Sequence, residues 1–191
     1  MRPTIVVPFR AGGKSRLPAR LRRPLALAML GDVLEQATAA GQLRLVTDDV
    51  GASDLARELG AIVIADPGGG QGPAVAAALS GIVGPCLVVN ADLPLVTATA
   101  IERLGAATPA LVAARDGTTN ALSLPGPDRF AQLYGPRSAV RFAALGLAPV
   151  SIPELELDVD TLADLERLTL PPGRRTRRVV NHHTPHLARA S

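Results

Sequence analysis

Short apolar runs alternate with longer segments of helical periodicity along most of this chain. Residues 5–7, 62–64 and 87–89 are continuous apolar runs, and such runs are typical of strands buried on both faces of a parallel sheet. Between the first two runs, apolar residues recur at helical spacing within residues 24–40. This alternation of strand and helix predicts an α/β protein.

The full pattern predicts a layered fold. Strands are expected at residues 4–8, 43–47, 61–65, 86–89, 111–114 and 120–124, with an extended segment at 150–152. Helices are expected at residues 24–40, 53–59, 74–82, 97–104, 129–133, 138–144 and 162–168, and residues 157–161 should end a strand and open the last helix. These elements predict a three-layer α/β/α sandwich with a mostly parallel, doubly wound sheet, in which ligands bind at the carboxyl ends of the strands.

The composition predicts one domain with an aliphatic core. The chain has 191 residues, of which 47% are hydrophobic but only 2% are aromatic, so aliphatic side chains must build the core. We expect this domain to span residues 1–170, because Pro171, Pro172 and Gly173 form the clearest boundary in the sequence. Residues 171–191 are then a basic tail rich in Pro, Arg and His.

The tail explains the basic balance of the chain. It carries five arginines, three histidines and no acidic residue, so that the net charge of +3 becomes −2 for residues 1–170. Such a tail can contact nucleic acid, but it is more often solvated and partly disordered, and we favour that interpretation. The histidines receive no catalytic role, because no Cys or carboxylate lies near them in the sequence.

The sequence predicts a cytoplasmic protein without membrane contact. No apolar run approaches the ~20 residues of a membrane span, and the amino terminus has no signal-peptide pattern. The single cysteine, Cys86, cannot form an internal disulfide and lies in a predicted strand, which fits a reducing compartment.

The loop after the first predicted strand carries the only lysine, Lys14, among nineteen arginines. A compact lysine ammonium fits a tight phosphate cradle better than a planar guanidinium does. A glycine turn with cations and a hydroxyl after a strand can hold the phosphates of a nucleotide, although a lone lysine can also survive by drift. The spacing is neither that of a Walker loop nor Gly-x-Gly-x-x-Gly. The candidate nucleotide-binding residues of this loop are Arg10, Gly12, Gly13, Lys14, Ser15 and Arg16.

Three aspartates are candidate metal ligands. Asp92 directly follows a predicted strand, and Asp158 and Asp160 flank Val159. In an extended segment such spacing puts both carboxylates on one face, where two like charges repel unless a cation lies between them. Mg²⁺ prefers carboxylate oxygens together with substrate phosphates. The alternative is that these aspartates only cap helices or stabilise turns.

Two further loops can approach a ligand. Residues 66–73 contain four glycines and can bring backbone N–H groups near a phosphate or a flat base, with Gly69 and Gly70 as the candidates; an ordinary mobile crossover loop is the alternative. Residues 116–120 and 135–138 can form a second anion site at a helix amino terminus. There the alternative is an ordinary turn with Ser138 as a helix cap.

Together these segments resemble the nucleotidyltransferases that make coenzyme F-420, the 2-phospho-L-lactate or phosphoenolpyruvate guanylyltransferases. The resemblance implies a fold like that of the nucleotide-diphospho-sugar transferases, within a larger group that includes the molybdenum-cofactor guanylyltransferases. The matching pieces occur in the family's order: Val-Pro-Phe-Arg at 7–10, Lys-Ser-Arg-Leu at 14–17, Asp-Pro-Gly-Gly-Gly at 66–70, Ala-Asp-Leu-Pro at 91–94, Asp-Gly-Thr-Thr-Asn-Ala-Leu at 116–122, Tyr-Gly-Pro-Arg-Ser-Ala at 134–139 and Leu-Asp-Val-Asp-Thr at 157–161.

The resemblance implies a role for each candidate. Asp92, Asp158 and Asp160 match the family's metal-binding aspartates, which implies Mg²⁺ as the cofactor. Lys14 and Arg16 would lie against the GTP phosphates and act in catalysis together with Asp92. The positions that hold phosphoenolpyruvate or 2-phospho-L-lactate correspond to Thr119, Gly135 and Ser138.

The implied reaction is the transfer of GMP from GTP to the phosphate of the acceptor acid, with release of pyrophosphate. Two departures from the family pattern bear on it: Arg10 stands where members usually have a lysine, and Gln71-Gly72 replaces Leu-Asn after the glycines. Alternatives are a molybdenum-cofactor-type or sugar-phosphate nucleotidyltransferase, or a non-catalytic nucleotide-binding module. The sequence leaves open which acid is the acceptor and whether the protein is a homodimer.

Overall fold

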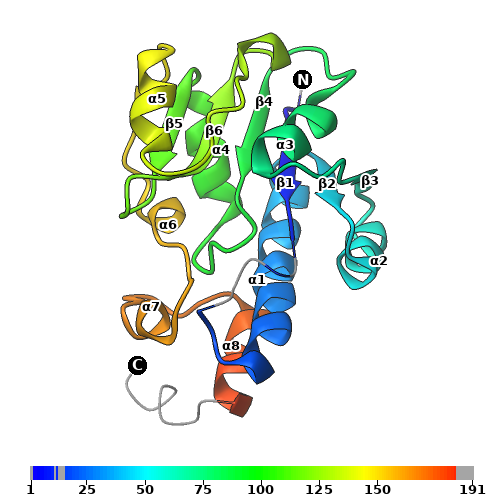
Figure 1. Cartoon of the computed structure of the whole chain (residues 1–191), viewed down its shortest axis with the longest axis vertical. Helices are drawn as coiled ribbons and strands as arrows, with labels where there is room; N and C mark the ends of the chain where they lie inside the picture. Colours follow the sequence, from blue (N-terminus) through cyan, green and yellow to red (C-terminus); the bar gives the residue numbers. More distant parts are fainter. Residues whose placement is uncertain (1, 11, 13–15, 184–191) are drawn as a thin grey trace.

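One mixed sheet forms the centre of the molecule (Figure 1). The computed structural model describes residues 2–10, 12 and 16–183, and within them the strands are ordered β3-β2-β1-β4-β6-β5-β7. Strand β6 is antiparallel to both of its neighbours, and every other adjacent pair is parallel. The strands are β1 (Thr4–Pro8), β2 (Gln42–Thr47), β3 (Ile62–Ala65), β4 (Cys86–Val89), β5 (Ala110–Ala113), β6 (Thr119–Leu124) and β7 (Ala148–Pro149).

Helices cover both faces of this sheet. Four helices pack on one face: α1 (Ala19–Ala40), α2 (Val50–Glu58), α4 (Ala98–Ala106) and α6 (Pro153–Glu156). Two pack on the other: α3 (Gln71–Leu79) and α5 (Ser138–Ala144). The predicted three-layer α/β/α sandwich with a mostly parallel, doubly wound sheet is confirmed.

The central strand β1 explains the continuous apolar runs. Ile5 and Val7 pack in the layer of α1, Val6 packs in the layer of α3, and all three are fully buried. Because successive side chains of a strand point to opposite faces, a strand covered on both faces needs an apolar residue at every position. In β4, Cys86 is buried in the same way, and burial raises the pKa of its thiol to about 11, so this residue serves packing.

A third, smaller hydrophobic cluster lies around the first turns of α1. Two helices close it, α7 (Leu162–Glu166) and α8 (Arg174–His183), and Figure 1 shows both near the end of α1 that projects beyond the sheet. Its buried members are Leu17, Leu25, Met29, Val159 and Leu165.

Helix α8 differs from the solvated segment expected for this part of the chain. Val179 and Val180 pack against the third cluster, and Thr176 is fully buried. Residues 174–183 are therefore part of the packed structure, because their valines cover apolar side chains of α1. The division into a domain at 1–170 and a tail stays a prediction, and residues 184–191 lie outside the described residues.

Several boundaries differ from the prediction for local reasons. Helix α1 begins at Ala19 after Pro18 and carries Pro24 inside it, whereas the sequence analysis took Pro24 as the start. Residues 129–133 form no α-helix; a short 3-10 helix spans Pro127–Arg129 instead. The extended segment expected at residues 150–152 is not a strand; the two-residue strand β7 lies just before it, at Ala148–Pro149, and pairs with β5.

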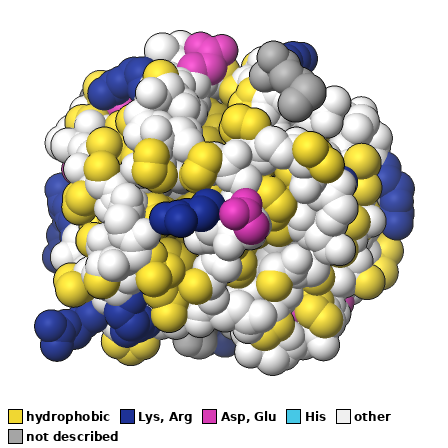
Figure 2. Space-filling model, turned by 90° about the horizontal axis from the view of Figure 1, so that it is seen from above, with side chains coloured by type: hydrophobic (Ala, Val, Ile, Leu, Met, Phe, Trp, Pro, Cys, Tyr) yellow, Lys and Arg dark blue, Asp and Glu magenta, His cyan; other side chains and the backbone are white. Residues whose placement is uncertain are grey.

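The end of the molecule at the amino ends of the parallel strands holds none of the candidate site residues that the structure describes. Figure 2 views the molecule from that end, where a few charged side chains, including a basic and an acidic one side by side, lie among hydrophobic and uncharged ones. Among the described residues, none of the helices combines the length and the apolar character that crossing a membrane requires. The candidate metal ligands lie at the opposite edge of the sheet, where the parallel strands end.

Candidate active site

Three aspartates converge at the carboxyl edge of the sheet. Asp92 lies in the turn after β4, and Asp158 and Asp160 lie between α6 and α7. One carboxylate oxygen from each residue lies within 4.8 Å of the corresponding oxygens of the other two. The structure thus brings together the three residues that the sequence proposed as metal ligands.

The backbone explains this convergence, although residues 157–161 are not the strand that the sequence predicted. They find no strand partner; instead the N–H of Val159 donates to the carbonyl of Asp92, at 3.2 Å. Val159 is fully buried in the third cluster. With this side chain anchored, the flanking Asp158 and Asp160 remain partly exposed beside the turn that carries Asp92.

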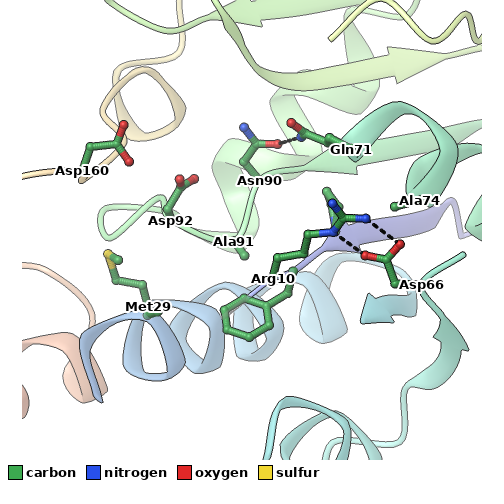
Figure 3. Close-up of a pocket in the computed structure, with 12 residues that line it drawn as sticks. Arg10, Met29, Asp66, Gln71, Ala74, Asn90, Ala91, Asp92 and Asp160 are labelled. Carbon is green, nitrogen blue, oxygen red and sulfur yellow. Dashed lines mark hydrogen bonds and ion pairs between the residues drawn. The ribbon is translucent and has the colours of Figure 1, made fainter. Parts of the chain in front are cut away.

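A cavity of about 220 Å³ adjoins the carboxylates. In Figure 3 its polar side chains run from Asp92 and Asp160 at one end to the Arg10–Asp66 pair at the other. Arg10, Asp66 and Asp92 come from the loops after β1, β3 and β4, whose carboxyl ends share one edge of the sheet, and Asp160 comes from the segment between α6 and α7. The remaining lining residues are Pro8, Phe9, Ala26, Met29, Gln71, Ala74, Asn90 and Ala91.

Arg10 is held by a bidentate ion pair with Asp66. Its Nε lies 2.5 Å from Asp66 Oδ2, and the second bond, from a terminal nitrogen to Oδ1, is 2.9 Å long. The guanidinium lowers the pKa of the Asp66 carboxyl below its usual value, because it stabilises the ionised form. The Asp66 side chain is 3% exposed and that of Arg10 is 43% exposed, so a fixed positive charge borders the cavity.

A chain of side-chain amides forms the wall between these two ends. Asn90 Nδ2 donates to the carbonyl of Thr119 at 3.1 Å, and Asn90 Oδ1 accepts from Gln71 Nε2 at 2.7 Å. The first bond fixes the orientation of the Asn90 amide, which in turn fixes that of Gln71. Gln71 Nε2 uses one of its two N–H groups in this bond, so its second N–H can donate to a ligand and Oε1 can accept from one.

The predicted phosphate loop is only partly described. Arg16 is exposed and lies beside the carboxylates, with a terminal nitrogen 3.9 Å from Asp160 Oδ2. Gly12 is exposed as well. Gly13, Lys14 and Ser15 lie outside the described residues, so their nucleotide-binding roles stay predictions.

The glycine loop leads into α3 next to the cavity. Gly68, Gly69 and Gly70 all have positive φ, at 82°, 80° and 110°, a region that side chains other than glycine rarely enter. Of the described residues in this segment, Asp66 and Gln71 line the cavity, while Gly69 and Gly70 supply the turn between them. The predicted contact of these two glycines with a nucleotide stays a prediction.

The three predicted acceptor-binding residues also lie together. The hydroxyls of Thr119 and Ser138 are 3.0 Å apart and buried, and the carbonyl of Gly135 accepts the Ser138 N–H at 3.0 Å. They form the junction of β6 and α5 and do not line the 220 Å³ cavity. Thr119 is nevertheless connected to it, because its carbonyl holds the Asn90 amide.

Sequence reasoning missed Asp66, Gln71 and Asn90 as site residues. Asp66 and Asn90 each follow directly on a predicted strand, and residues in that position meet at one edge of a parallel sheet. That rule, applied to every strand, would have identified both. Gln71 stood out only as a departure from the family pattern, and its place in the cavity lining and its bond to Asn90 show that it belongs to the site.

Comparison with known proteins identifies the family. The family model for the MobA-like NTP transferase domain matches residues 10–184. A phosphoenolpyruvate guanylyltransferase from Sphaerobacter thermophilus is 38% identical over 177 residues, covering 81% of this chain and 86% of that protein. Another, from Nocardia farcinica, is 36% identical over 191 residues, covering 87% and 84%. The chain belongs to the phosphoenolpyruvate guanylyltransferase family.

Membership makes the protein an enzyme of the nucleotidyltransferase class and confirms the resemblance found in the sequence. Solved structures with this fold include a Desulfovibrio desulfuricans protein assigned to the nucleotide-diphospho-sugar transferases, with a TM-score of 0.72 at 14% identity over 98% of this chain and 97% of that one. A nucleotidyl transferase from Methanothermobacter has a TM-score of 0.61 at 16% identity, covering 100% and 99%. At such identities the likeness concerns the fold alone.

The acidic cluster fits the chemistry of this family. Nucleotidyltransferases of this kind typically use a divalent metal ion, and three convergent carboxylates provide the oxygen ligands that hard divalent cations prefer. Asp92, Asp158 and Asp160 are therefore the candidate metal site of this phosphoenolpyruvate guanylyltransferase family member.

Proposed function

We propose that the protein joins GMP from GTP to the phosphate of phosphoenolpyruvate, with release of pyrophosphate, as a step in coenzyme F-420 biosynthesis. The observation that carries the proposal is the cluster of three carboxylates beside a cavity that the Arg10 guanidinium, fixed by Asp66, borders. The names of relatives that match more than four fifths of this chain supply the acceptor and the nucleotide.

We assign Mg²⁺ to Asp92, Asp158 and Asp160. Three carboxylates with oxygens within 4.8 Å of one another repel each other strongly without a cation, and an all-oxygen set suits Mg²⁺ better than a softer metal. When bound, Mg²⁺ supplies Lewis-acid stabilisation of phosphate charge.

The reaction needs alignment more than covalent chemistry. An oxygen of the acceptor phosphate forms a bond to the α-phosphorus of GTP as the bond from that phosphorus to pyrophosphate breaks. The acceptor is already an anion, so no enzyme nucleophile is required, and catalysis consists of positioning and charge stabilisation. Arg16, which lies beside the carboxylates, and Lys14 would offset the charge on the departing pyrophosphate. Arg10, fixed by Asp66, would add a positive charge at the other end of the cavity.

The nucleotide would extend from the carboxylates towards α3. In this arrangement Gly12, Gly13, Ser15, Gly69 and Gly70 approach the nucleotide through their backbone. Gln71 Oε1 is an acceptor, which matches the N–H groups on the Watson–Crick edge of guanine. Arg10 and Asp66 complete this end of the cavity.

The acceptor would bind where β6 meets α5, through Thr119, Gly135 and Ser138. The two hydroxyls bond to each other in the structure, and each would exchange that partner for a phosphate or carboxylate oxygen. A small phosphorylated acid suits such a compact junction. 2-Phospho-L-lactate is the second candidate acceptor because it differs from phosphoenolpyruvate only in the saturation of one carbon–carbon bond. A cytoplasmic location and a homodimer remain predictions.

Pyrophosphate release tests this proposal. Purified protein with Mg²⁺ is given each of the four nucleoside triphosphates, with phosphoenolpyruvate, with 2-phospho-L-lactate or with no acceptor, and the product is identified by mass spectrometry. We expect release that requires GTP and phosphoenolpyruvate and yields the mixed diphosphate. Release that requires GTP and only 2-phospho-L-lactate would change the acceptor, and no release with either acid would reject the proposal.

A further inference from the structure

Asp32 is an acidic residue buried in the middle of α1. It is 4% exposed, and burying a carboxylate is costly unless hydrogen bonds satisfy it. Its two oxygens accept the backbone N–H groups of Arg175 and Thr176, each at 2.9 Å. A residue on one helix thus binds the first turn of another helix, more than 140 positions away in the sequence.

This contact replaces the cap that α8 lacks. Helix α8 begins at Arg174, so Arg175 and Thr176 are its second and third residues, whose N–H groups an N-cap side chain normally satisfies. The preceding residue is Gly173, which has no side chain with which to do so. The negative charge of Asp32 also lies next to the positive end of the α8 dipole, which stabilises the helix.

The fit between the two helices is close. A Cβ added to Gly173 would lie 2.3 Å from the Cγ of Asp32, and one added to Gly31 would lie 2.5 Å from the side chain of Arg175. Glycine is therefore required at residue 173 for α8 to pack on α1, because the contact there is with the buried Asp32 side chain. At residue 31 a larger side chain would displace the flexible Arg175 side chain. Outside this buried contact, Glu35 binds the Arg175 guanidinium at 2.9 Å.

Two backbone hydrogen bonds connect the contact between α1 and α8 to the acidic cluster. The N–H of Gly173 donates to the carbonyl of Pro94 at 2.9 Å, and the N–H of Val159 donates to the carbonyl of Asp92 at 3.2 Å. Both ends of the turn that carries Asp92 are therefore held by the carboxyl-terminal third of the chain. Helix α8 also packs Val179 and Val180 on the cluster that buries Val159.

We propose that Asp32 is a positioning residue for the metal site: by capping α8, it fixes the turn of Asp92 and the segment of Asp158 and Asp160 against each other. The inference rests on the proposed function, since it assumes that these three carboxylates bind the metal. A ten-residue helix is marginal on its own, so its position depends on this anchor.

The test measures metal affinity and local order in the full-length protein without substrates. Mn²⁺, detected by electron paramagnetic resonance, replaces Mg²⁺ as the probe, and hydrogen exchange follows the amides of Val159 and Gly173. The variants are Asp32→Asn, which removes one acceptor and the charge, and Gly173→Ala, which keeps Asp32 but forces α8 away. Glu35→Gln is the matched control on the same helix, because it weakens the partly buried side-chain contacts with Arg174 and Arg175 and leaves the Asp32 cap in place.

We expect Asp32→Asn and Gly173→Ala to weaken Mn²⁺ binding about tenfold, in the range seen when residues that orient metal ligands are changed. Both should speed exchange at the amides of residues 159 and 173, while Glu35→Gln stays within about twofold of the wild type. Should Asp32→Asn not fold, Gly173→Ala decides the question.

Lower thermal stability with unchanged Mn²⁺ affinity in both variants would overturn the inference, since Asp32 would then be merely structural. Wild-type protein that binds no Mn²⁺ would overturn it too. Weakened Mn²⁺ binding in the variants supports the inference even if the wild type releases no pyrophosphate with any acceptor, a result that would reject only the proposed function.

Discussion

Replacing Asp92 by asparagine should stabilise the metal-free protein and at the same time impair metal binding and activity. Asn is nearly isosteric with Asp, so the turn keeps its shape. The change removes one negative charge from the cluster of Asp92, Asp158 and Asp160, and with it two of the three repulsive pairs. A site that binds a cation should gain stability without metal and lose metal affinity when one of its carboxylates is removed.

The separation of the carboxylates sets the size of the effect. At 4.8 Å, the upper limit given by the structure, two unit charges repel by about 0.9 kcal/mol in water and about 3.5 kcal/mol at an effective dielectric constant of 20. Losing two pairs relieves roughly 2–7 kcal/mol on this basis. The residues are partly exposed and Arg16 lies nearby, so we expect about 2 kcal/mol, equivalent to a rise in Tm of roughly 4–8 °C for a chain of this size.

Thermal unfolding in EDTA, followed by circular dichroism, measures the first effect. A titration with Mn²⁺ and the pyrophosphate-release assay measure the second, for which we expect a loss of at least about 100-fold in turnover, the size of effect reported for removing one preorganised electrostatic contact. Asp54→Asn is the control, because Asp54 is an exposed aspartate on α2, outside the acidic cluster, and pairs with Arg57. It should alter neither property appreciably.

An Asp92→Asn protein that melts below the wild type in EDTA and retains its Mn²⁺ affinity would refute the reasoning. The carboxylates would then be stabilised by contacts within the protein, and the cluster would not be a metal site. Near-native turnover at ordinary Mg²⁺ concentration would remove Asp92 from the proposed mechanism.

Three further changes test the rest of the site. Asp66→Asn should cost about 1 kcal/mol of stability at pH 7. Because the pKa of Asp66 is lowered in the folded protein, the difference in stability from the wild type should shrink as the pH falls below about 4. Urea unfolding at several pH values measures this difference, and one that persists at low pH would contradict the prediction. Gln71→Leu should raise the KM for GTP about tenfold with little change in kcat, and equal loss with all nucleotides would contradict its role at guanine. Ser138→Ala should raise the KM for phosphoenolpyruvate more than that for GTP, and unchanged acceptor kinetics would exclude the β6–α5 junction.

The sequence pattern predicted the bounds of an element correctly where residues that break secondary structure flank it on both sides. The observed bounds of β1, β4 and α5 agree with the prediction, because each is a short apolar or helical segment between strong breaking residues. Helix α1 was predicted too short because two prolines competed for its start, and only packing of Leu21 and Leu25 in the core favours Pro18.

The convergence of the site could be predicted only in part. Asp92 and the pair around Val159 were identified by their types and spacing, but their proximity depends on one backbone bond between distant segments. Asp32 gave no signal at all, since an aspartate in a long helix usually faces solvent. Its burial follows from the docking of α8, a tertiary contact that no local pattern encodes.

The reversed strand β6 has a consequence for how this enzyme family can diversify. Because β6 runs against its neighbours, its first residues, not its last, reach the edge where the other strands end. In the proposed function, the nucleotide end of the site is thus built from β1, β3 and β4, and the acceptor end from one contiguous piece of chain running from β6 into α5. Substitutions at the start of β6 and of α5 can therefore change which acceptor binds while the loops after β1 and β3, which border the nucleotide, keep their residues.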